Sequence, residues 1–369
     1  MAWISVKSAR DGMVIMRTIP MESSSFYTRR LPRGCRLCRK GTKMVLLVTG
    51  KCAMSCYYCP LSEKKKNRDV VYANERLVEK DEDVLEEAMA IGARGTGITG
   101  GDPLAVIDRT VHYIKMLKER FGSQHHIHLY TSTIDRDKFL RLQESGLDEL
   151  RLHPPVDNWG HLDELGIAES LEGLTIDVGF EVPAIPGERE GLLALCRYAS
   201  EHDLGFVNLN ELEISETNSQ ALLGRGLTIR SDTSSAIQDS EGLAREVVNT
   251  MGADVAIHFC SSSFKDRVQL RERLKRRAKR VARPMDLVTR EGMILLGIVE
   301  ADDPVWAMRL LEKEYEVPLE LMFLDEKRKR LEVASWVLED LASRLPLQCY
   351  LVEEYPTADR LEVEREPLN

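Results

Sequence analysis

The chain has 369 residues and a mass of 41.9 kDa, and 43% of its residues are hydrophobic while 30% are charged. These proportions are typical of a globular chain and exclude the collagen-like and disordered classes. Fifty-one basic and sixty acidic residues give a formal net charge of −9 at pH 7, which argues against a generic nucleic-acid binder. No apolar run reaches the length of about eighteen residues that a membrane helix needs, and the first twenty residues lack the core of a secretion signal. We therefore expect a cytoplasmic protein with no membrane partner.

Short apolar runs alternate with helical patterns over most of the chain. Seven strands, each followed by a helix, predict a parallel sheet with helices outside. Because the series is too short for eight repeats, we expect an α/β fold of the partial (β/α)-barrel type, with ligands at the carboxyl ends of the strands. The predicted strands cover residues 44–50, 95–99, 126–132, 148–152, 176–182, 206–215 and 254–259.

The chain divides into four predicted segments. Residues 1–42 form an N-terminal extension with a Cys-x-x-Cys pair, and residues 43–262 form the partial barrel. Residues 263–285 form a basic helix, and residues 286–369 form a small α+β domain that begins after Pro284. The patterns in this last segment suggest the order β-α-β-β-α-β.

The eight cysteines are unevenly distributed. Five fall within 25 residues, at positions 35, 38, 52, 56 and 59. Tight groups in a chain otherwise poor in cysteine are typical of metal or cluster ligands rather than of a disulfide framework. Cys196 and Cys349 lie in apolar patterns and are interpreted as core residues.

The first predicted strand runs directly into the sequence KCAMSCYYCP at residues 51–60. Thiolates are the usual protein ligands of iron–sulfur clusters, and three of them in one loop can hold three irons and leave a fourth open. The spacing of Cys52, Cys56 and Cys59, placed after the first strand of a β/α series, resembles the radical S-adenosylmethionine (SAM) superfamily. A zinc knuckle with a remote fourth ligand is the alternative interpretation.

A second match lies at the end of the next predicted strand. Gly100, Gly101 and Asp102, followed by Pro103, resemble the Gly-Gly-Glu-Pro segment of the same superfamily. The resemblance implies that this backbone and its acid hold the amino group of SAM. Glycine permits a close backbone approach, and a carboxylate suits an ammonium group. This chain departs from the pattern in carrying the shorter Asp102 where glutamate is more common.

Further matches follow along the chain, each of which also fits an ordinary loop or strand residue. The resemblance implies contacts with SAM for Tyr58, before the last cysteine, for Ser132, for Ile185 and for Asn210. Together the matches cover about residues 43–260. Within the superfamily, this part of the chain is most similar to the branch related to the pyruvate formate-lyase-activating enzyme.

The resemblance also implies an enzyme mechanism. A [4Fe–4S] cluster, reduced by a donor of the ferredoxin or flavodoxin type, would give one electron to SAM. Cleavage of SAM would yield methionine and a 5′-deoxyadenosyl radical that abstracts a hydrogen atom from the substrate. Such a cluster is sensitive to oxygen.

The second group of cysteines suggests another metal site. Cys35 and Cys38 have the shape of a knuckle, and His258 and Cys260 lie at the end of the last predicted strand. These residues are predicted to hold zinc or a second iron–sulfur cluster, and the sequence does not decide between the two. The alternative is a simple Cys-x-x-Cys turn and an unrelated Cys260.

The segment from Lys265 to Arg283 has ten basic and two acidic residues, which gives it a local charge of +8 and leaves −17 for the rest. Its pattern predicts one helix with a narrow apolar face. Because the helix would start near the carboxyl ends of the strands, we expect it to contact a polyanion. The alternative is a solvated helix whose charges pair with the acidic body. The cations predicted to contact nucleic acid are Arg271, Lys275, Arg276, Arg277, Lys279 and Arg280.

Three functions follow from these features. The first is a radical SAM enzyme that modifies RNA, with tRNA as the expected substrate. The second is an activase of a glycyl-radical enzyme, or another modifier of a protein. The third is a zinc-bearing RNA-binding protein without catalysis.

Overall fold

The computed structural model describes residues 18–369 and divides the chain into two compact units. The first unit contains the cysteine motif and most of the strands that the sequence predicts. The second contains the basic helix and the C-terminal domain. Residues 18–36, 45–71 and 95–268 form the first unit, and residues 37–44, 72–94 and 269–369 form the second.

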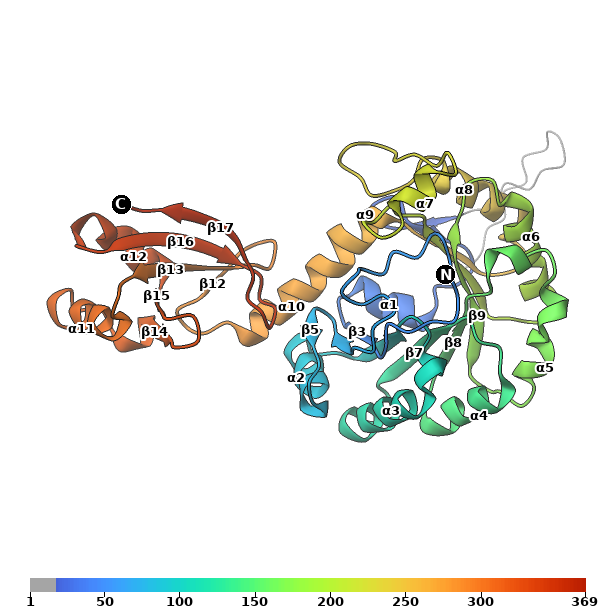
Figure 1. The fold of residues 1–369 in the computed structure, drawn as a ribbon, viewed down its shortest axis with the longest axis horizontal. Helices are drawn as coiled ribbons and strands as arrows, with labels where there is room; N and C mark the ends of the chain where they lie inside the picture. Colours follow the sequence, from blue (N-terminus) through green and yellow to red (C-terminus); the bar gives the residue numbers. More distant parts are fainter. Residues whose placement is uncertain (1–17) are drawn as a thin grey trace, which may run out of the picture. The chain divides into compact units, whose positions relative to one another are not determined.

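The first unit is built around a largely parallel sheet, which Figure 1 shows curving around a central space. Its strands lie in the order β1-β2-β11-β10-β9-β8-β7-β6-β3, and the five pairs between β6 and β11 are parallel. The α/β fold with a partial barrel is confirmed. The strands are β1 (Ile19–Pro20), β2 (Phe26–Tyr27), β3 (Lys43–Leu47), β6 (Gly95–Thr99), β7 (His126–Thr131), β8 (Glu149–Leu152), β9 (Asp177–Ala184), β10 (Phe206–Glu211) and β11 (Ile257–Cys260).

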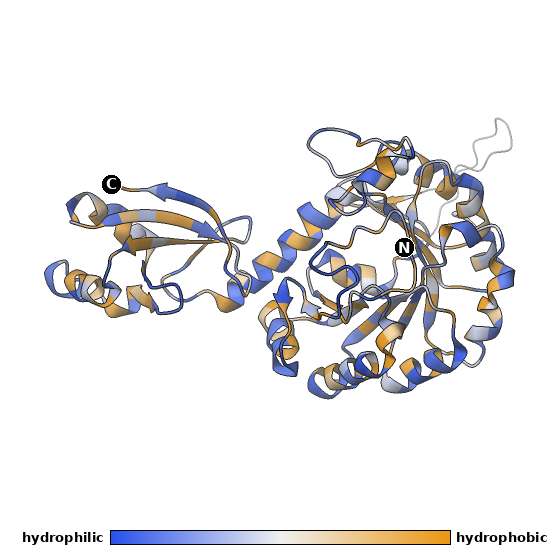
Figure 2. Ribbon diagram, viewed as in Figure 1, coloured by the Kyte–Doolittle hydropathy of each residue, from blue (hydrophilic) through white to orange (hydrophobic). Residues whose placement is uncertain are grey.

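The helices that connect these strands lie on the outside of the sheet (Figure 1). Hydrophobic and hydrophilic segments alternate along them, as expected for helices that bury one face (Figure 2). In α4 (Arg136–Ser145), for example, Phe139 and Leu142 are buried, and the Asp135 side chain caps the first turn. The others are α3 (Ile107–Phe121), α5 (Ile167–Leu171), α6 (Arg189–Glu201), α7 (Ser219–Leu223) and α8 (Ser240–Met251).

A helix that the sequence did not predict begins before the first barrel strand. This helix, α1 (Arg33–Arg39), replaces the expected knuckle around Cys35, and Figure 1 shows it inside the ring of strands. A Cβ atom on Gly34 would lie 2.4 Å from His128 Nδ1 and 2.6 Å from Arg151 Nη2. The backbone N–H of Gly34 donates to the Glu149 carboxylate (3.2 Å). The start of α1 therefore fills part of the barrel interior, and only glycine fits at this approach.

The second unit contains a small antiparallel sheet covered by helices, in the predicted order β-α-β-β-α-β. Its strands lie in the order β14-β15-β13-β16-β17, and β12 pairs with β13. This arrangement is a split β-α-β fold with two strands added, β12 and β17. Its elements are β12 (Leu287–Val288), β13 (Ile294–Glu300), α11 (Pro304–Glu314), β14 (Met322–Asp325), β15 (Arg330–Val333), α12 (Ser335–Leu341), β16 (Gln348–Glu354) and β17 (Glu362–Pro367).

Both faces of this small sheet are apolar. Val299 and Leu331 pack with Leu311 of α11 and Leu338 of α12 on one face. On the other, β13 packs against Ala278 of helix α10 (Arg271–Val281), which is the basic helix of the sequence analysis. The same unit contains the hairpin of β4 (Tyr72–Ala73) and β5 (Arg76–Leu77) and helix α2 (Asp81–Ile91).

The sequence predicted one regular helix for the basic segment, but the structure shows two different helical parts. It starts after the short helix α9 (Ser262–Phe264) with a π-helical turn at Lys265–Leu270 and continues as α10. Within residues 18–369, none of the helices has the length and apolar character needed to cross a membrane.

Candidate functional site

The cysteine motif forms a loop that follows β3 at the carboxyl edge of the sheet. Cys52, Cys56 and Cys59 are all free thiols and partly buried. Cys52 Sγ accepts a hydrogen bond from the Met54 N–H (3.3 Å). Burial raises the pKa values of the Cys52 and Cys56 thiols. Because a metal binds the thiolate form, binding of a metal would release the protons of these thiols.

Glycines hold this loop against its neighbours. A Cβ atom on Gly50 would lie 1.6 Å from the carbonyl oxygen of Lys65, and one on Gly101 would lie 2.2 Å from the carbonyl oxygen of Lys51. A Cβ on Gly100 would lie 2.6 Å from the carbonyl oxygen of Thr49 in the same way. The Gly100–Gly101 turn thus packs directly on the start of the cysteine loop, and any side chain would separate them.

Asp102 is 3% exposed, and its carboxylate accepts five hydrogen bonds from the chain. One oxygen accepts from the Leu104 N–H (2.9 Å) and the Thr131 hydroxyl (2.7 Å). The other accepts from the Ser132 hydroxyl (3.1 Å), the Thr133 N–H (3.1 Å) and the Thr133 hydroxyl (2.8 Å). The carboxylate thereby joins the loop after β6 to the loop after β7. The contacts of Asp102 and Ser132 with SAM stay predictions.

A salt bridge that the sequence analysis missed fixes the base of the cysteine loop. Asp69 accepts from the Thr49 hydroxyl (3.0 Å) and from Arg109 (2.6 Å), and Lys51 lies 3.4 Å away. Arg109 also donates to the carbonyl oxygen of Val48 (2.9 Å). The hydrogen bond from Arg109 lowers the pKa of Asp69, so the carboxylate is ionised at neutral pH.

Tyr58 is buried next to His153, just beyond the end of β8. Its hydroxyl lies 3.1 Å from His153 Nε2, and His153 Nδ1 lies 2.7 Å from the carbonyl oxygen of Glu181. Burial raises the pKa of Tyr58 and lowers that of His153, so both side chains are neutral. The predicted role of Tyr58 at SAM stays a prediction.

The cysteine loop is also attached to the connection between β10 and α8. The Asn218 side chain donates to the carbonyl oxygen of Tyr58 (3.0 Å) and to that of Glu213 (3.0 Å), and it accepts from the Ser215 N–H (2.7 Å). Asn218 is 1% exposed. The side-chain amide of Asn218 therefore links the cysteine loop to this connection. Asn218 could not be selected from the sequence, because asparagine in a loop carries no distinctive pattern.

The barrel interior contains a buried network of charged and polar groups. Glu181 accepts from Arg151, from the Asn208 amide (3.0 Å) and from the Asn210 amide (2.9 Å). Burial would raise the pKa of Glu149, but Arg151 and the neighbouring His126 lower it to about 2. The structure thus places Asn210 in this network. Its predicted contact with SAM, like that of the buried Ile185, remains a prediction.

The residues of the predicted second metal site make other contacts. Cys35 Sγ accepts from Arg151 Nη2 (3.4 Å) and Asn208 Nδ2 (3.6 Å), whereas the Cys38 thiol donates to Gln269 Oε1 (2.7 Å). Cys260 is buried in a small apolar cluster. The His258 ring lies 3.3 Å from the Asn208 side-chain oxygen.

Metal-binding geometry does not decide between the predicted sites. In the described part of the chain, no three His, Cys, Asp or Glu side chains are arranged to hold a metal ion, and this applies to Cys52, Cys56 and Cys59 as well. The second site with Cys35, Cys38 and Cys260 therefore stays a prediction. Cys196 and Cys349 are fully buried, in agreement with their interpretation as core residues.

Several cations of the basic helix are used inside the second unit. Arg276 donates to the last carbonyl oxygens of α2, those of Ile91 (3.0 Å) and Gly92 (3.1 Å). Arg277 is 8% exposed and pairs with Glu87. These internal contacts occupy the guanidinium groups of Arg276 and Arg277, and their predicted contact with nucleic acid stays a prediction.

The other predicted nucleic-acid contacts are less constrained. Arg271 and Lys275 each lie 3.7 Å from Glu272 on the same helix. Arg280 lies against Gly92, where a Cβ atom would be 2.3 Å from its guanidinium group. Lys279 is exposed.

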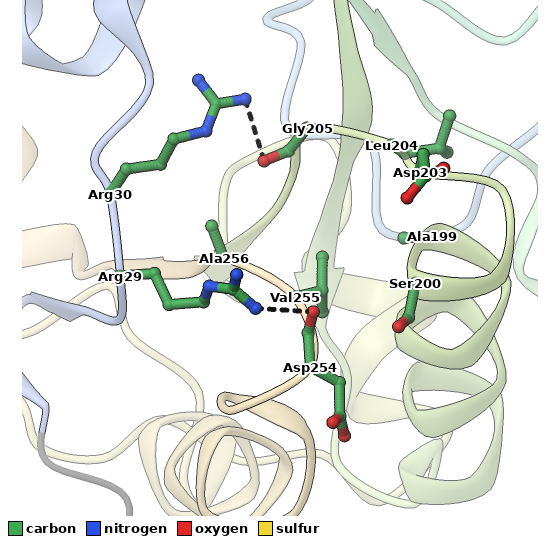
Figure 3. Close-up of a pocket in the computed structure, with 10 residues that line it drawn as sticks. All are labelled: Arg29, Arg30, Ala199, Ser200, Asp203, Leu204, Gly205, Asp254, Val255 and Ala256. Atoms are coloured by element: carbon green, nitrogen blue, oxygen red, sulfur yellow. Dashed lines mark hydrogen bonds between the residues drawn. The ribbon is translucent and has the colours of Figure 1, made fainter.

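A cavity of about 520 Å³ lies at the opposite end of the barrel strands (Figure 3). Its walls include Gly205, just before β10, and Asp254, just before β11. Arg30 donates to the Gly205 carbonyl oxygen (3.0 Å), and Arg29 donates to that of Asp254 (2.9 Å). Because ligands of such folds bind at the carboxyl ends of the strands, this cavity is not the reaction site.

Comparison with known proteins finds a family profile that includes the cysteine loop. The profile of the radical SAM superfamily matches residues 46–157, and a profile described as a domain of unknown function (DUF8061) matches residues 292–368. A protein of Methanocaldococcus jannaschii, provisionally named a glycyl-radical enzyme activating enzyme, is 42% identical over 357 residues. The match covers 92% of this chain and 93% of that protein.

The solved structures are more distant. The FeFe-hydrogenase maturase HydG from Carboxydothermus hydrogenoformans is 16% identical, with a TM-score of 0.40, over 60% of this chain and 56% of that one. Methylornithine synthase is also 16% identical, with a TM-score of 0.39, over 62% of this chain and 75% of that one. The chain thus spans little more than half of HydG.

Proposed function

This chain belongs to the radical SAM superfamily, in the branch related to the pyruvate formate-lyase-activating enzyme, and we propose that it activates a protein substrate by abstracting a hydrogen atom from it. It is an enzyme whose cofactors are a [4Fe–4S] cluster and SAM, and its reaction needs a reductant. The proposal adds that the substrate is a protein of the glycyl-radical type.

The residues of the cysteine loop fit an iron–sulfur cluster. Cys52, Cys56 and Cys59 are free, partly buried thiols in one loop, and soft sulfur is the donor that such clusters take. The three side chains would hold three of the four irons. When bound, the cluster and SAM supply a one-electron cleavage that yields a 5′-deoxyadenosyl radical.

The chain itself supplies position and shelter. Gly50 and Gly101 let three backbone segments meet at the cysteine loop, and Asp102 fixes the neighbouring loop through its five hydrogen bonds. Tyr58 and His153 close the inner side of the loop with neutral groups. The start of α1 fills the interior below, which leaves the carboxyl edge as the place where a substrate can react.

The observation that carries the proposal is the 42% identity to the provisionally named activating enzyme over 92% of this chain. A relationship along almost the full length includes the C-terminal domain as well as the barrel. The internal contacts of Arg276 and Arg277 leave fewer cations of the basic helix for RNA, which favours the protein substrate over the RNA alternative.

The test is anaerobic reconstitution with iron, sulfide, SAM and dithionite, followed by assay of 5′-deoxyadenosine. A candidate glycyl-radical protein, chosen from the genes next to the one for this chain, is then added. We expect an electron paramagnetic resonance signal on that protein and one 5′-deoxyadenosine per radical formed. The Cys52→Ala/Cys56→Ala/Cys59→Ala variant is the control and should give neither product.

Two results would contradict the proposal. Absence of 5′-deoxyadenosine from the reconstituted protein would show that the protein does not cleave SAM reductively. Modified nucleosides in added tRNA, found by mass spectrometry without a radical on the protein, would make RNA the substrate.

A further inference from the structure

A compact basic turn follows the cysteine loop and has no role in the function proposed so far. Residues 62–68 read SEKKKNR, with four basic side chains and one acid. The Lys65 and Lys66 N–H groups donate to the carbonyl oxygen of Ser62 (2.9 and 2.8 Å), and the Arg68 N–H donates to that of Lys65 (3.1 Å). Asn67 adopts a left-handed conformation with φ of 60°. These bonds give the segment a defined shape.

The basic turn is attached to the first residue of the cysteine loop. The Asn67 N–H donates to the Gly50 carbonyl oxygen (2.9 Å), and the Gly50 N–H donates to the Arg68 carbonyl oxygen (2.8 Å). The carbonyl oxygen of Lys65 occupies the place where Gly50 would carry a Cβ atom. Gly50 is two residues before Cys52, so the turn is fixed in position next to the cluster ligands.

The cations of this turn are available at the surface. Lys64 and Arg68 are exposed, and within residues 18–369 neither side chain makes an ion pair. Lys51, by contrast, pairs with Asp69. The adjoining cysteine loop is also exposed at Ala53 and at Met54, whose exposed fraction is 38%. Apolar and cationic groups therefore share one surface at the cluster ligands.

We propose that the basic turn is the docking site of an acidic electron-carrier protein, a low-potential iron–sulfur protein or flavoprotein. The inference rests on the proposed function, since each cleavage of SAM consumes one electron. The reduced carrier would be oxidised by one electron, which the cluster held by the cysteine loop would pass to SAM for cleavage of its carbon–sulfur bond.

Charge supports this choice of partner. The chain carries a net charge of −9, whereas the basic turn contributes +3. The net charge of the chain repels an acidic carrier, whereas the turn attracts it at a position next to the cysteine loop. Charges at the rim of such a transient complex act mainly on the association rate and make it dependent on salt.

The experiment compares a chemical and a protein reductant. The variant Lys64→Glu/Arg68→Glu reverses two charges of the basic turn. The matched control, Lys115→Glu/Arg197→Glu, makes the same change on exposed residues of the outer helices α3 and α6. Initial rates of 5′-deoxyadenosine formation are measured with dithionite and with a reduced ferredoxin or flavodoxin, over a series of salt concentrations.

With dithionite, we expect wild-type rates for both variants. With the protein reductant at low salt, we expect the turn variant to be slower by about tenfold or more, which is within the range of electrostatic steering. The wild-type rate should fall as the salt concentration rises, whereas the rate of the turn variant should not. The control variant should behave as the wild type does.

Four results would overturn the inference. The first is an equal protein-driven rate for the two variants. The second is an equal loss of rate in the turn variant when dithionite is the reductant, since the turn would then support the structure of the cysteine loop. The third is normal reduction by the carrier together with loss of activation of the substrate protein, which would make the turn a substrate contact. The fourth is absence of product from the wild type with dithionite, which would also remove the proposed function.

Discussion

The side-chain amide of Asn218 donates a hydrogen bond of 3.0 Å to the carbonyl oxygen of Tyr58, the residue directly before Cys59. This bond joins the connection after β10 to the loop after β3, which are distant in the sequence. Thr217 makes a longer contact of the same kind, 3.4 Å from its hydroxyl to the carbonyl oxygen of Cys59. The cysteine loop is thus held from the far side of the barrel by side chains that do not bind the cluster.

Asn218→Ala and Asn218→Asp should both make the cluster less stable. The first leaves the carbonyl groups of Tyr58 and Glu213 without their donor, at a cost of about 1–3 kcal/mol, and the second places a carboxylate beside them. We expect less iron per chain after reconstitution and faster loss of cluster absorbance with a chelator. Thr217→Val is the milder control, and an unchanged half-life for both Asn218 variants would contradict the role of the bond.

Replacement of Cys52, Cys56 or Cys59 by alanine should abolish the cluster. Two thiolates cannot hold three irons, so each variant should lose the cluster absorbance and the formation of 5′-deoxyadenosine. Cys196→Ala is a suitable control, because burial raises the pKa of that thiol to about 12 and Cys196 lies in the core of α6. A cluster retained in any of the three variants would show that another residue replaces the lost ligand.

Asp102 can be tested by changing the length of its side chain. Asp102→Asn removes the charge, whereas Asp102→Glu keeps it but does not fit a 3% exposed site that already has five donors. Loss of a charge-assisted hydrogen bond costs about 1.5–3 kcal/mol, so we expect each variant to bind SAM about tenfold or more weakly.

The measurement is equilibrium SAM binding to protein that has its cluster, together with the melting temperature. Tight binding by Asp102→Glu would mean that the carboxylate contacts SAM directly. The loop after β7 would then keep its position without the hydrogen bonds to the Asp102 carboxylate.

The pair of Arg277 and Glu87 should stabilise the second unit. Arg277→Met leaves Glu87 buried without its cation, and breaking a buried pair typically costs about 3–5 kcal/mol. We expect a lower denaturation midpoint in urea, with partial recovery in Arg277→Met/Glu87→Met. Lys279→Met, on the exposed side of the same helix, should change the free energy of unfolding by less than about 0.5 kcal/mol. Equal midpoints for Arg277→Met and Lys279→Met would show that the pair of Arg277 and Glu87 does not stabilise the second unit.

His125 should make the protein sensitive to mild acid. Burial lowers the pKa of His125 to about 4, whereas an unfolded chain keeps the usual value near 6.5. Between these two values the unfolded state binds more protons, so stability falls as the pH falls, by at most about 1.4 kcal/mol per pH unit. His125→Asn should flatten the dependence of the unfolding free energy on pH between about 6.5 and 4. An unchanged slope would assign the sensitivity to another group.

The features that could be predicted from the sequence are those carried by short, local patterns. Apolar runs bounded by polar residues predicted β6 at its observed bounds and the other parallel strands within a few residues. The spacing of Cys52, Cys56 and Cys59 indicated the family, which the comparisons confirm. Gly100 and Gly101, selected for an approach to SAM, lie close to the carbonyl oxygens of Thr49 and Lys51, and their contact with SAM stays a prediction.

Features that depend on distant partners could not be predicted in this way. The five donors to Asp102 include three consecutive hydroxyl residues about one β/α unit further along the chain. Arg277 pairs with Glu87, 190 positions away, so its position on a cationic helix gave no sign of burial. Helix α1 was missed because seven residues with glycine and two cysteines are too few to show a helical period.

The pairing of β2 with β11 has a consequence for the order of folding. Phe26 and Tyr27 align with Phe259 and His258, and the neighbouring Thr28 hydroxyl contacts the carbonyl oxygen of Val255, 227 positions away. During synthesis, the segment that contains β2 leaves the ribosome first, but its partner strand is among the last of the barrel to appear. Contacts of such long sequence separation slow folding and leave apolar segments exposed while they wait. The growing chain must therefore keep Phe26 and its neighbours from other partners until the last parallel strand has emerged.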